Sequence, residues 1–93
     1  METTVRKAED RSRYELVADG DEVVGYADYR DDGQRVVLPH TVIDPSMRGR
    51  GLGDVLVRGA LDDLRADDRT VVPACWFVAE FIERNADYGH MVG

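Results

Sequence analysis

The first half of the chain has the hydrophobic pattern of a β-meander. Three β-prone runs, Arg13–Ala18, Glu22–Arg30 and Arg35–Ile43, are separated by the pairs Asp19-Gly20 and Asp32-Gly33. An Asp-Gly pair between such runs is a strong hairpin signal, because the tight turns that suit the strand twist need positive φ angles. Neither face of Glu22–Arg30 is cleanly polar, so we expect this strand to lie inside the sheet.

The second half of the chain changes to the period of a helix. From Leu52 to Arg65 the apolar residues form one stripe, and most of the charged residues lie outside it. Thr70–Cys75 then has the pattern of a short strand, which lies at an edge or ends irregularly at Pro73 because proline cannot donate to a ladder. A second helix is predicted over Trp76–Arg84, and its inward-facing residues are Phe77, Val78, Phe81 and Ile82.

These elements predict a single domain over residues 1–93. An antiparallel meander that feeds one crossover helix is typical of an α+β fold, here a mainly antiparallel mixed sheet with two principal helices packed on it. A chain of this length can bury one core, and we expect Trp76, Phe77 and Phe81 to lie in it. We expect residues 1–11 to form a frayed start.

Charge and composition narrow the class of protein. The formal net charge of −7 argues against a nucleic-acid binder, because such proteins need a basic face. No apolar run approaches the length of a membrane span, and the N-terminal residues contain no apolar signal-peptide region. The lone cysteine cannot form an internal disulfide and fits a reducing, cytoplasmic location. We therefore expect no nucleic-acid or membrane partner, and a monomer or a homodimer.

The segment from Asp44 to Asp54 is the strongest functional signal in the sequence. It reads Asp-Pro-Ser-Met-Arg-Gly-Arg-Gly-Leu-Gly-Asp and stands between the third β-prone run and the first helical run. A glycine-rich turn before a helix N-terminus directs backbone N–H groups outward, and the helix dipole adds partial positive charge. Glycine also lets a phosphate approach the main chain without a Cβ in the way. The segment predicts a site for a phosphate-bearing ligand.

The spacing of the glycines excludes two nucleotide-binding loops. The dinucleotide fingerprint G-x-G-x-x-G fails, because Asp54 stands where a glycine must follow Gly49 and Gly51. The Walker loop needs a lysine, and the only lysine in the chain is Lys7. The spacing that fits is R-x-x-G-x-G, from Arg48 to Gly53. It resembles motif A of the GNAT superfamily, the acetyl-coenzyme-A-dependent N-acetyltransferases, whose consensus is Q/R-x-x-G-x-G/A.

This resemblance implies that the loop binds the pyrophosphate of acetyl-coenzyme A. The amides from Arg50 to Asp54 would hold the pyrophosphate, and main-chain groups of Thr41 and Ile43 would pair with the pantetheine arm as an added strand does. In the family fold the strands that carry His40–Ile43 and Thr70–Cys75 splay apart, so the thioester would lie in the gap, where an unpaired main-chain N–H would stabilise the oxyanion. The expected coenzyme-binding residues are Thr41, Ile43, Arg48, Gly49, Arg50, Gly51, Leu52, Gly53 and Asp54.

A closer resemblance runs from about Tyr14 to the end of the chain, to minimal, single-domain GNAT proteins of unassigned substrate. It rests on His40-Thr41-x-Ile43, Val71-Val72-Pro73-x-Cys75-x-Phe77-Val78 and Ile82-x-Arg84-x-x-x-Tyr88. Two positions depart from the family pattern. Those proteins often read H-T-E-V, but Val42 replaces the acidic residue and removes a base there. By alignment of the last helix, Ile82 takes the place of the tyrosine that many larger members use as a general acid.

Cys75 and His40 are the candidate catalytic residues. Because the resemblance places Cys75 near the reacting sulfur, it would act as a thiolate nucleophile or as a proton donor to the departing coenzyme A, unless it is simply a small buried residue. Histidine accepts a proton readily near neutral pH, so His40 would act as a base, unless it is a structural residue after Pro39. On facing strands the two would form a pair. The spacing of His90 and Cys75 matches no metal site, and we expect no metal.

The sequence thus predicts an enzyme that passes an acetyl group from acetyl-coenzyme A to an unidentified amine, on a small molecule or a protein. One alternative is a module that binds coenzyme A or acyl-coenzyme A with little or no turnover. Another is a scaffold that dimerises through an exposed strand or helix.

Overall fold

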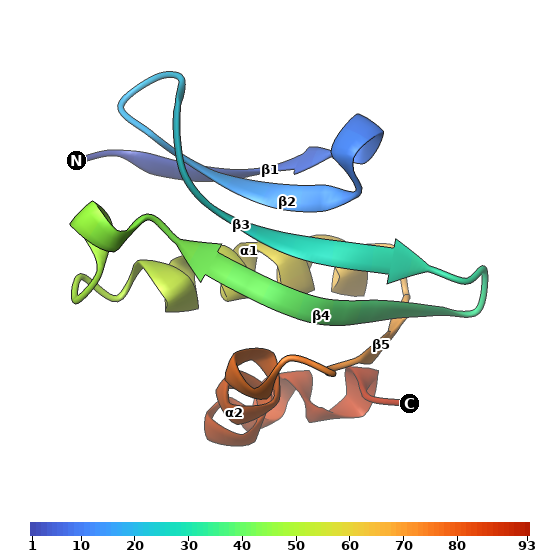
Figure 1. The fold of residues 1–93 in the computed structure, drawn as a ribbon. Coiled ribbons are helices and arrows are strands. Elements are labelled where there is room, and N and C mark those ends of the chain that lie inside the picture. Colours follow the sequence, from blue (N-terminus) through green and yellow to red (C-terminus); the bar gives the residue numbers. More distant parts are fainter.

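Five strands form one curled sheet in the computed structural model, which describes residues 1–93 (Figure 1). The strands lie in chain order: β1 (Thr3–Ala8), β2 (Arg13–Ala18), β3 (Glu22–Asp31), β4 (Arg35–Ile43) and β5 (Thr70–Val72). The first four pair antiparallel, whereas β5 joins β4 in parallel after a helical crossover. The predicted α+β class, with a mixed and mainly antiparallel sheet, is confirmed.

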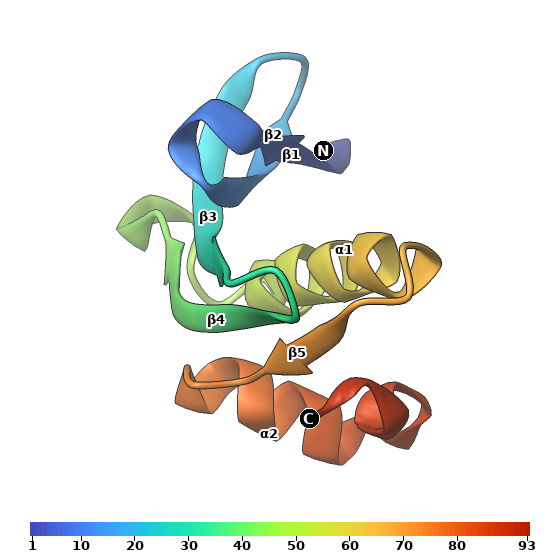
Figure 2. The ribbon, with the colours of Figure 1, turned by 90° about the vertical axis from the view of Figure 1, so that its right-hand side faces the viewer.

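Two α-helices pack on this sheet, α1 (Leu52–Ala66) and α2 (Trp76–Arg84). Helix α1 covers one face of the sheet, and α2 lies beside β5 (Figure 2). Three short 3-10 helices, Glu9–Arg11, Pro45–Met47 and Ala86–Met91, complete the chain. The core forms between the sheet and the apolar stripes of the helices, and its fully buried residues include Leu16, Leu38, Leu56, Leu61 and Phe81. No helix is both long enough and apolar enough to cross a membrane.

Two expectations about the strands are confirmed. Strand β3 lies between β2 and β4, inside the sheet. Strand β5 is the last strand and ends at Val72, directly before Pro73. Only an isolated bridge between Val71 and Val92 lies beyond it. The missing N–H of proline therefore falls where the ladder stops.

The expectation of a frayed N-terminus is wrong, because Thr3–Ala8 forms β1. Val5 is partly buried against the core, and a Cβ added at Gly59 of α1 would lie 2.6 Å from its side chain. On the other side of the strand, the Arg6 guanidinium lies 3.1 Å from the buried carboxylate of Glu15. Both contacts are made with residues outside the strand, so the local sequence pattern does not predict it.

The expectation that Trp76 lies in the core is also wrong, since this side chain is 73% exposed. Trp76 is the first residue of α2, and the buried stripe of that helix is formed by Val78, Phe81 and Ile82. Phe77 is only partly buried, whereas Phe81 is fully buried as predicted. The helix period places Trp76 outside the stripe, toward solvent.

Strands β4 and β5 pair over only part of their length. Their register runs from Arg35 opposite Thr70 to Val37 opposite Val72, and the Cys75 N–H then donates to the Leu38 carbonyl at 2.9 Å. Beyond this hydrogen bond the end of β4 has no strand beside it on that edge. The separation is the splay expected from the family resemblance.

An irregularity in β4 turns its main-chain groups toward that open edge. Between the pairs Asp28–His40 and Arg30–Val37, β3 advances two residues while β4 advances three. After the irregularity the Asp44 N–H donates to the Val24 carbonyl at 2.8 Å. Because every second residue of an antiparallel strand faces the same neighbour, the main-chain groups of Thr41 and Ile43 point away from β3, to the edge that β5 leaves open.

Candidate functional site

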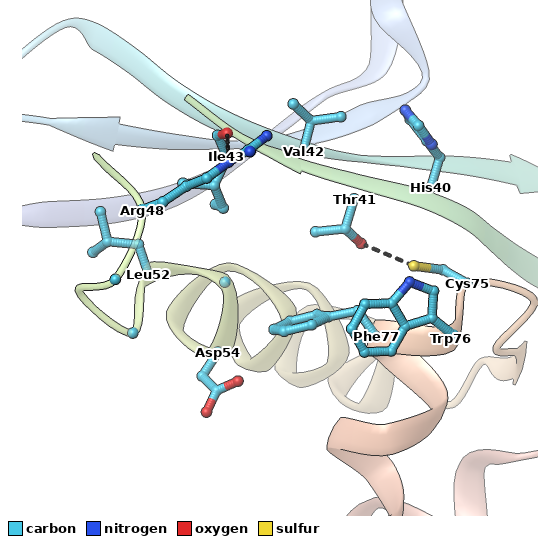
Figure 3. Close-up of a pocket in the computed structure, with 13 residues that line it drawn as sticks. His40, Thr41, Val42, Ile43, Arg48, Leu52, Asp54, Cys75, Trp76 and Phe77 are labelled. Atoms are coloured by element: carbon cyan, nitrogen blue, oxygen red, sulfur yellow. Dashed lines mark hydrogen bonds between the residues drawn. The ribbon is translucent and has the colours of Figure 1, made fainter. Parts of the chain in front are cut away.

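A pocket of about 670 Å³ lies between the end of β4, the glycine-rich loop and the start of α2 (Figure 3). We call it the β4–α2 pocket. Its lining residues are His40, Thr41, Val42, Ile43, Arg48, Gly49, Gly51, Leu52, Gly53, Asp54, Cys75, Trp76 and Phe77. Every residue predicted from the sequence to bind a ligand or to act in catalysis is in this set except Arg50, which lies exposed in the loop.

The loop is shaped by hydrogen bonds at its start and by two glycines in its middle. The backbone N–H and the hydroxyl of Ser46 donate to the Asp44 carboxylate at 3.0 and 2.8 Å. These bonds hold the pKa of Asp44 below its usual value. Gly49 and Gly51 have φ angles of +81° and +72°, a region that other L-residues rarely adopt. A Cβ added at either position would contact nothing, so backbone conformation is what requires glycine here.

The loop presents a row of free backbone donors. From Gly49 to Asp54 no backbone N–H donates to any acceptor of the protein, and the first bond of α1 runs from the Val55 N–H to the Gly51 carbonyl at 3.4 Å. The first N–H groups of a helix lack intrahelical partners and carry the positive end of the helix dipole. Exposed donors of this kind in a glycine-rich turn form a site for an anion such as phosphate.

Arg48 connects this loop to the strand before it. Its Nε donates to the Ile43 carbonyl at 3.3 Å, which is a carbonyl on the open edge of β4 (Figure 3). The Leu52 side chain is buried in the core, so only the backbone of this residue is available to a ligand. The Asp54 carboxylate receives a hydrogen bond from Arg84 of α2 at 3.2 Å. The loop is thus held on both sides by polar contacts that leave its amides free.

Phe77 forms the wall of the pocket opposite the strand, a role that the sequence did not indicate. A Cβ at Gly53 would lie 2.7 Å from the tip of the Phe77 ring. Gly53 therefore allows the ring to lie directly on the first turn of α1. The only sequence signal for this contact is the third glycine of the loop, whose pattern by itself indicates phosphate binding.

Cys75 lies at the far end of the pocket, where it precedes α2. The residue is only 9% exposed, and its Sγ donates to the Thr41 hydroxyl at 3.6 Å (Figure 3). The His40 ring is exposed and points to the other side of β4, with its centre 6.3 Å from that of Tyr26. The structure therefore joins Cys75 to Thr41 and does not join it to His40.

The two residues that depart from the family pattern, Val42 and Ile82, both lie against other parts of the protein. Val42 is partly buried in the pocket wall, and Ile82 is 7% exposed within the core. Neither side chain can hold or move a proton. No cluster of three or more His, Cys, Asp and Glu side chains is arranged to hold a metal ion.

A solved structure shares this architecture. The structure superimposes with a TM-score of 0.71 on the solution structure of a "GCN5-like putative N-acetyltransferase" from Staphylococcus aureus, over 97% of this chain and 87% of that chain. The two sequences are 18% identical, so the match concerns the fold.

The sequence comparisons identify the family. The family model described as GCN5-related N-acetyl-transferase matches residues 13–91. Protein NATD1 of Bos taurus is 34% identical over 58 residues, which are 61% of this chain and 51% of that protein. Protein NATD1 of Homo sapiens is 33% identical over 58 residues, with the same two shares. The chain spans about half the length of these curated relatives. It belongs to the GCN5-related N-acetyltransferase family.

Proposed function

We propose that this protein binds acetyl-coenzyme A in the β4–α2 pocket and transfers the acetyl group to an amine. The row of unbonded N–H groups from Gly49 to Asp54 is the observation that carries the proposal. It lies at one end of a pocket whose other end holds the Cys75 thiol. A diphosphate fits the first end, because its oxygens accept several hydrogen bonds at once and carry the charge that the helix dipole favours.

The open edge of β4 supports the path of the pantetheine arm. Main-chain groups of Thr41 and Ile43 face the pocket without a strand partner, so an extended chain with amide groups can add there as a strand would. Phe77 forms the opposite, apolar wall. An extended arm between these two walls leads from the loop to Cys75 and Thr41.

The proposed reaction forms a C–N bond and breaks a C–S bond. The neutral amine attacks the thioester carbonyl, an N–H of the open β4 edge stabilises the oxyanion, and the amine proton ends on the sulfur of coenzyme A. Cys75 either donates that proton or takes the acetyl group first, in which case Thr41 holds its Sγ in place. His40 is the remaining candidate base, acting on the amine from the exposed side of β4.

The binding step is tested by calorimetric titration with acetyl-coenzyme A. We expect saturable binding to the purified protein and release of free coenzyme A when an amine from a panel is added. A flat titration at millimolar ligand would refute both the transferase and the alternative, a coenzyme-A-binding module with little turnover. That alternative is favoured by the apolar Val42 and Ile82, and binding without coenzyme A release from any amine would support it.

The role of Cys75 is tested by mass spectrometry after incubation with acetyl-coenzyme A. If the transfer passes through an acyl-cysteine, the protein gains one acetyl group and the Cys75→Ala variant does not. If Cys75 is only a proton donor, no adduct forms and Cys75→Ala lowers kcat by about 10²–10⁴-fold while the KM for acetyl-coenzyme A stays unchanged. Wild-type turnover in Cys75→Ala would exclude both roles.

A further inference from the structure

Trp76 is the most exposed large apolar side chain of the protein, at 73%. It lines the β4–α2 pocket at the end where Cys75 lies (Figure 3). The Phe77 ring meets the indole edge-on, with ring centres 5.9 Å apart and planes at 84°. The indole is thus supported by Phe77 while most of its surface is open to solvent.

Trp76 lacks the nearby cation that most of the other aromatic rings have. Every tyrosine, and Phe81, has a lysine or arginine within about 6 Å of its ring centre, as in the contact of Arg13 with Tyr26 at 4.4 Å. The two rings without such a cation are Trp76 and Phe77, and both line the pocket. Tryptophan is the side chain that attracts a cation over its ring most strongly.

The charges near Trp76 also favour a cation. Glu80 and Glu83 follow Trp76 on α2 at helical spacing, so their side chains lie along the same exposed stripe and lean toward its N-terminal end. Glu83 forms no ion pair, and Glu80 has only a 3.7 Å contact with Arg84. Arg48 and Arg50 belong to the loop at the opposite end of the pocket, and Arg84, which flanks the pocket, is paired with Asp54 at 3.2 Å as well as with Glu80.

We infer that Trp76 is the platform that receives the amine acceptor, and that this acceptor is an alkylamine whose chain carries a second positive charge. The inference rests on the proposed acetyl transfer, since it gives that site its substrate class. The second ammonium lies over the indole while the reacting, neutral amine reaches the Cys75 end of the pocket. A diamine or polyamine and a lysine in a basic peptide share this chemistry.

The first experiment uses intrinsic fluorescence, because Trp76 is the only tryptophan in the chain. The protein is saturated with coenzyme A, which has no acetyl group to transfer, and titrated with diaminobutane or with butanediol of the same length at constant ionic strength. We expect saturable quenching by the diamine and none by the diol. An equal response to both compounds, or no response to either, would overturn the inference.

The second experiment measures kcat/KM for diaminobutane and for aminobutanol, which lacks the second charge. We expect Trp76→Leu to lower the value for the diamine by about two- to thirtyfold more than the value for aminobutanol. Trp76→Phe should lie between. Glu83→Gln should weaken the preference for the diamine, whereas Glu22→Gln, an exposed carboxylate outside the pocket, should not.

The outcomes separate this inference from the proposed function. An equal loss for both acceptors in Trp76→Leu would make the indole an apolar wall, and a loss of acetyl-coenzyme A affinity alone would make it a cover for the coenzyme; either result contradicts the platform. Selective quenching by the diamine without turnover of any amine would support the platform and refute the transferase. A basic peptide with an internal lysine, compared with diaminobutane, shows which source the site prefers.

Discussion

At the scale of single residues, the same residue type serves different purposes along the glycine loop. Gly51 is required by its backbone angle, φ +72°, whereas Gly53 makes room for the Phe77 ring. Glycine in the sequence indicated a loop but not which of these needs it meets. Likewise, the family resemblance made Cys75 a candidate, and only the structure shows that its partner is the Thr41 hydroxyl rather than His40.

The first prediction concerns Gly51. In Gly51→Val we expect the affinity for acetyl-coenzyme A to fall by about tenfold or more, because the strained backbone and the new side chain displace the free amides of the loop. A left-handed angle also costs a β-branched residue about 1–2 kcal/mol of stability. Calorimetry and urea unfolding measure the two effects.

Gly33→Val is the matched control for that variant. Gly33 has φ +92° in the turn before β4, and a Cβ there meets nothing, so this variant has a similar strain outside the pocket. We expect a similar loss of stability with unchanged affinity. If Gly51→Val keeps its affinity, or if Gly33→Val loses as much, the phosphate site is not at the loop.

At the scale of elements, the two strands at the sheet edges differ most from local expectation. β1 is polar at most of its positions, yet it pairs along its whole length with β2. β5 is short, and the divergence of β4 from it creates the pocket. Whether an edge segment forms a strand depends on its contacts with the neighbouring strand and helix, so the propensity of its own residues predicts little.

The second prediction tests β1 with two substitutions in the same strand. Val5→Asp should lower the free energy of unfolding by about 1–3 kcal/mol, because it buries a polar group against α1. Thr4→Asp has a similar loss of strand propensity, but Thr4 is exposed, so its effect should stay within about 0.5 kcal/mol. Chemical denaturation checks both. Equal, small effects would mean that β1 is frayed after all.

At the scale of the whole molecule, the chain has a net charge of −7, yet three of its arginines gather around one buried carboxylate. Arg6, Arg11 and Arg13 surround the buried carboxylate of Glu15, at 2.9–3.3 Å. Burial raises the pKa of Glu15, but the hydrogen bonds from Arg13 and Arg6 outweigh it and hold the pKa below its usual value. Tyr14 is buried, and its hydroxyl donates to Asp63 of α1; the burial and this hydrogen bond both raise the pKa of Tyr14.

The third prediction is the pH dependence that follows from these shifts. Because the pKa of Glu15 is lower in the folded state, its contribution to stability is complete above about pH 4.5 and is lost as the pH falls through the folded value. Because the pKa of Tyr14 is higher in the folded state, stability falls above about pH 10, where only the unfolded chain loses this proton. Urea midpoints across the pH range measure both losses of stability, which we call the acid limb and the alkaline limb.

Two variants assign these limbs to their residues. Glu15→Gln should flatten the acid limb while lowering stability at neutral pH, since three guanidinium groups then surround a neutral side chain. Tyr14→Phe should make the alkaline loss of stability smaller and leave the acid loss unchanged; the remainder comes from Tyr88, whose pKa is also raised by burial and by its hydrogen bond to Asp62. An unaltered acid limb in Glu15→Gln would assign it to other carboxylates, such as Asp31, whose pKa is held low by Arg69.

The sequence by itself determined the features that depend on nearby residues. Asp-Gly turns, the apolar stripe of α1, the stop at Pro73 and the spacing of the loop glycines are local, and so the meander, the helices and the position of the loop were predictable. The tertiary structure decided the rest: that β1 pairs, that Trp76 stays exposed, that Phe77 walls the pocket and that Cys75 meets Thr41. Each of these depends on surfaces brought together by the fold, whose packing no local pattern encodes.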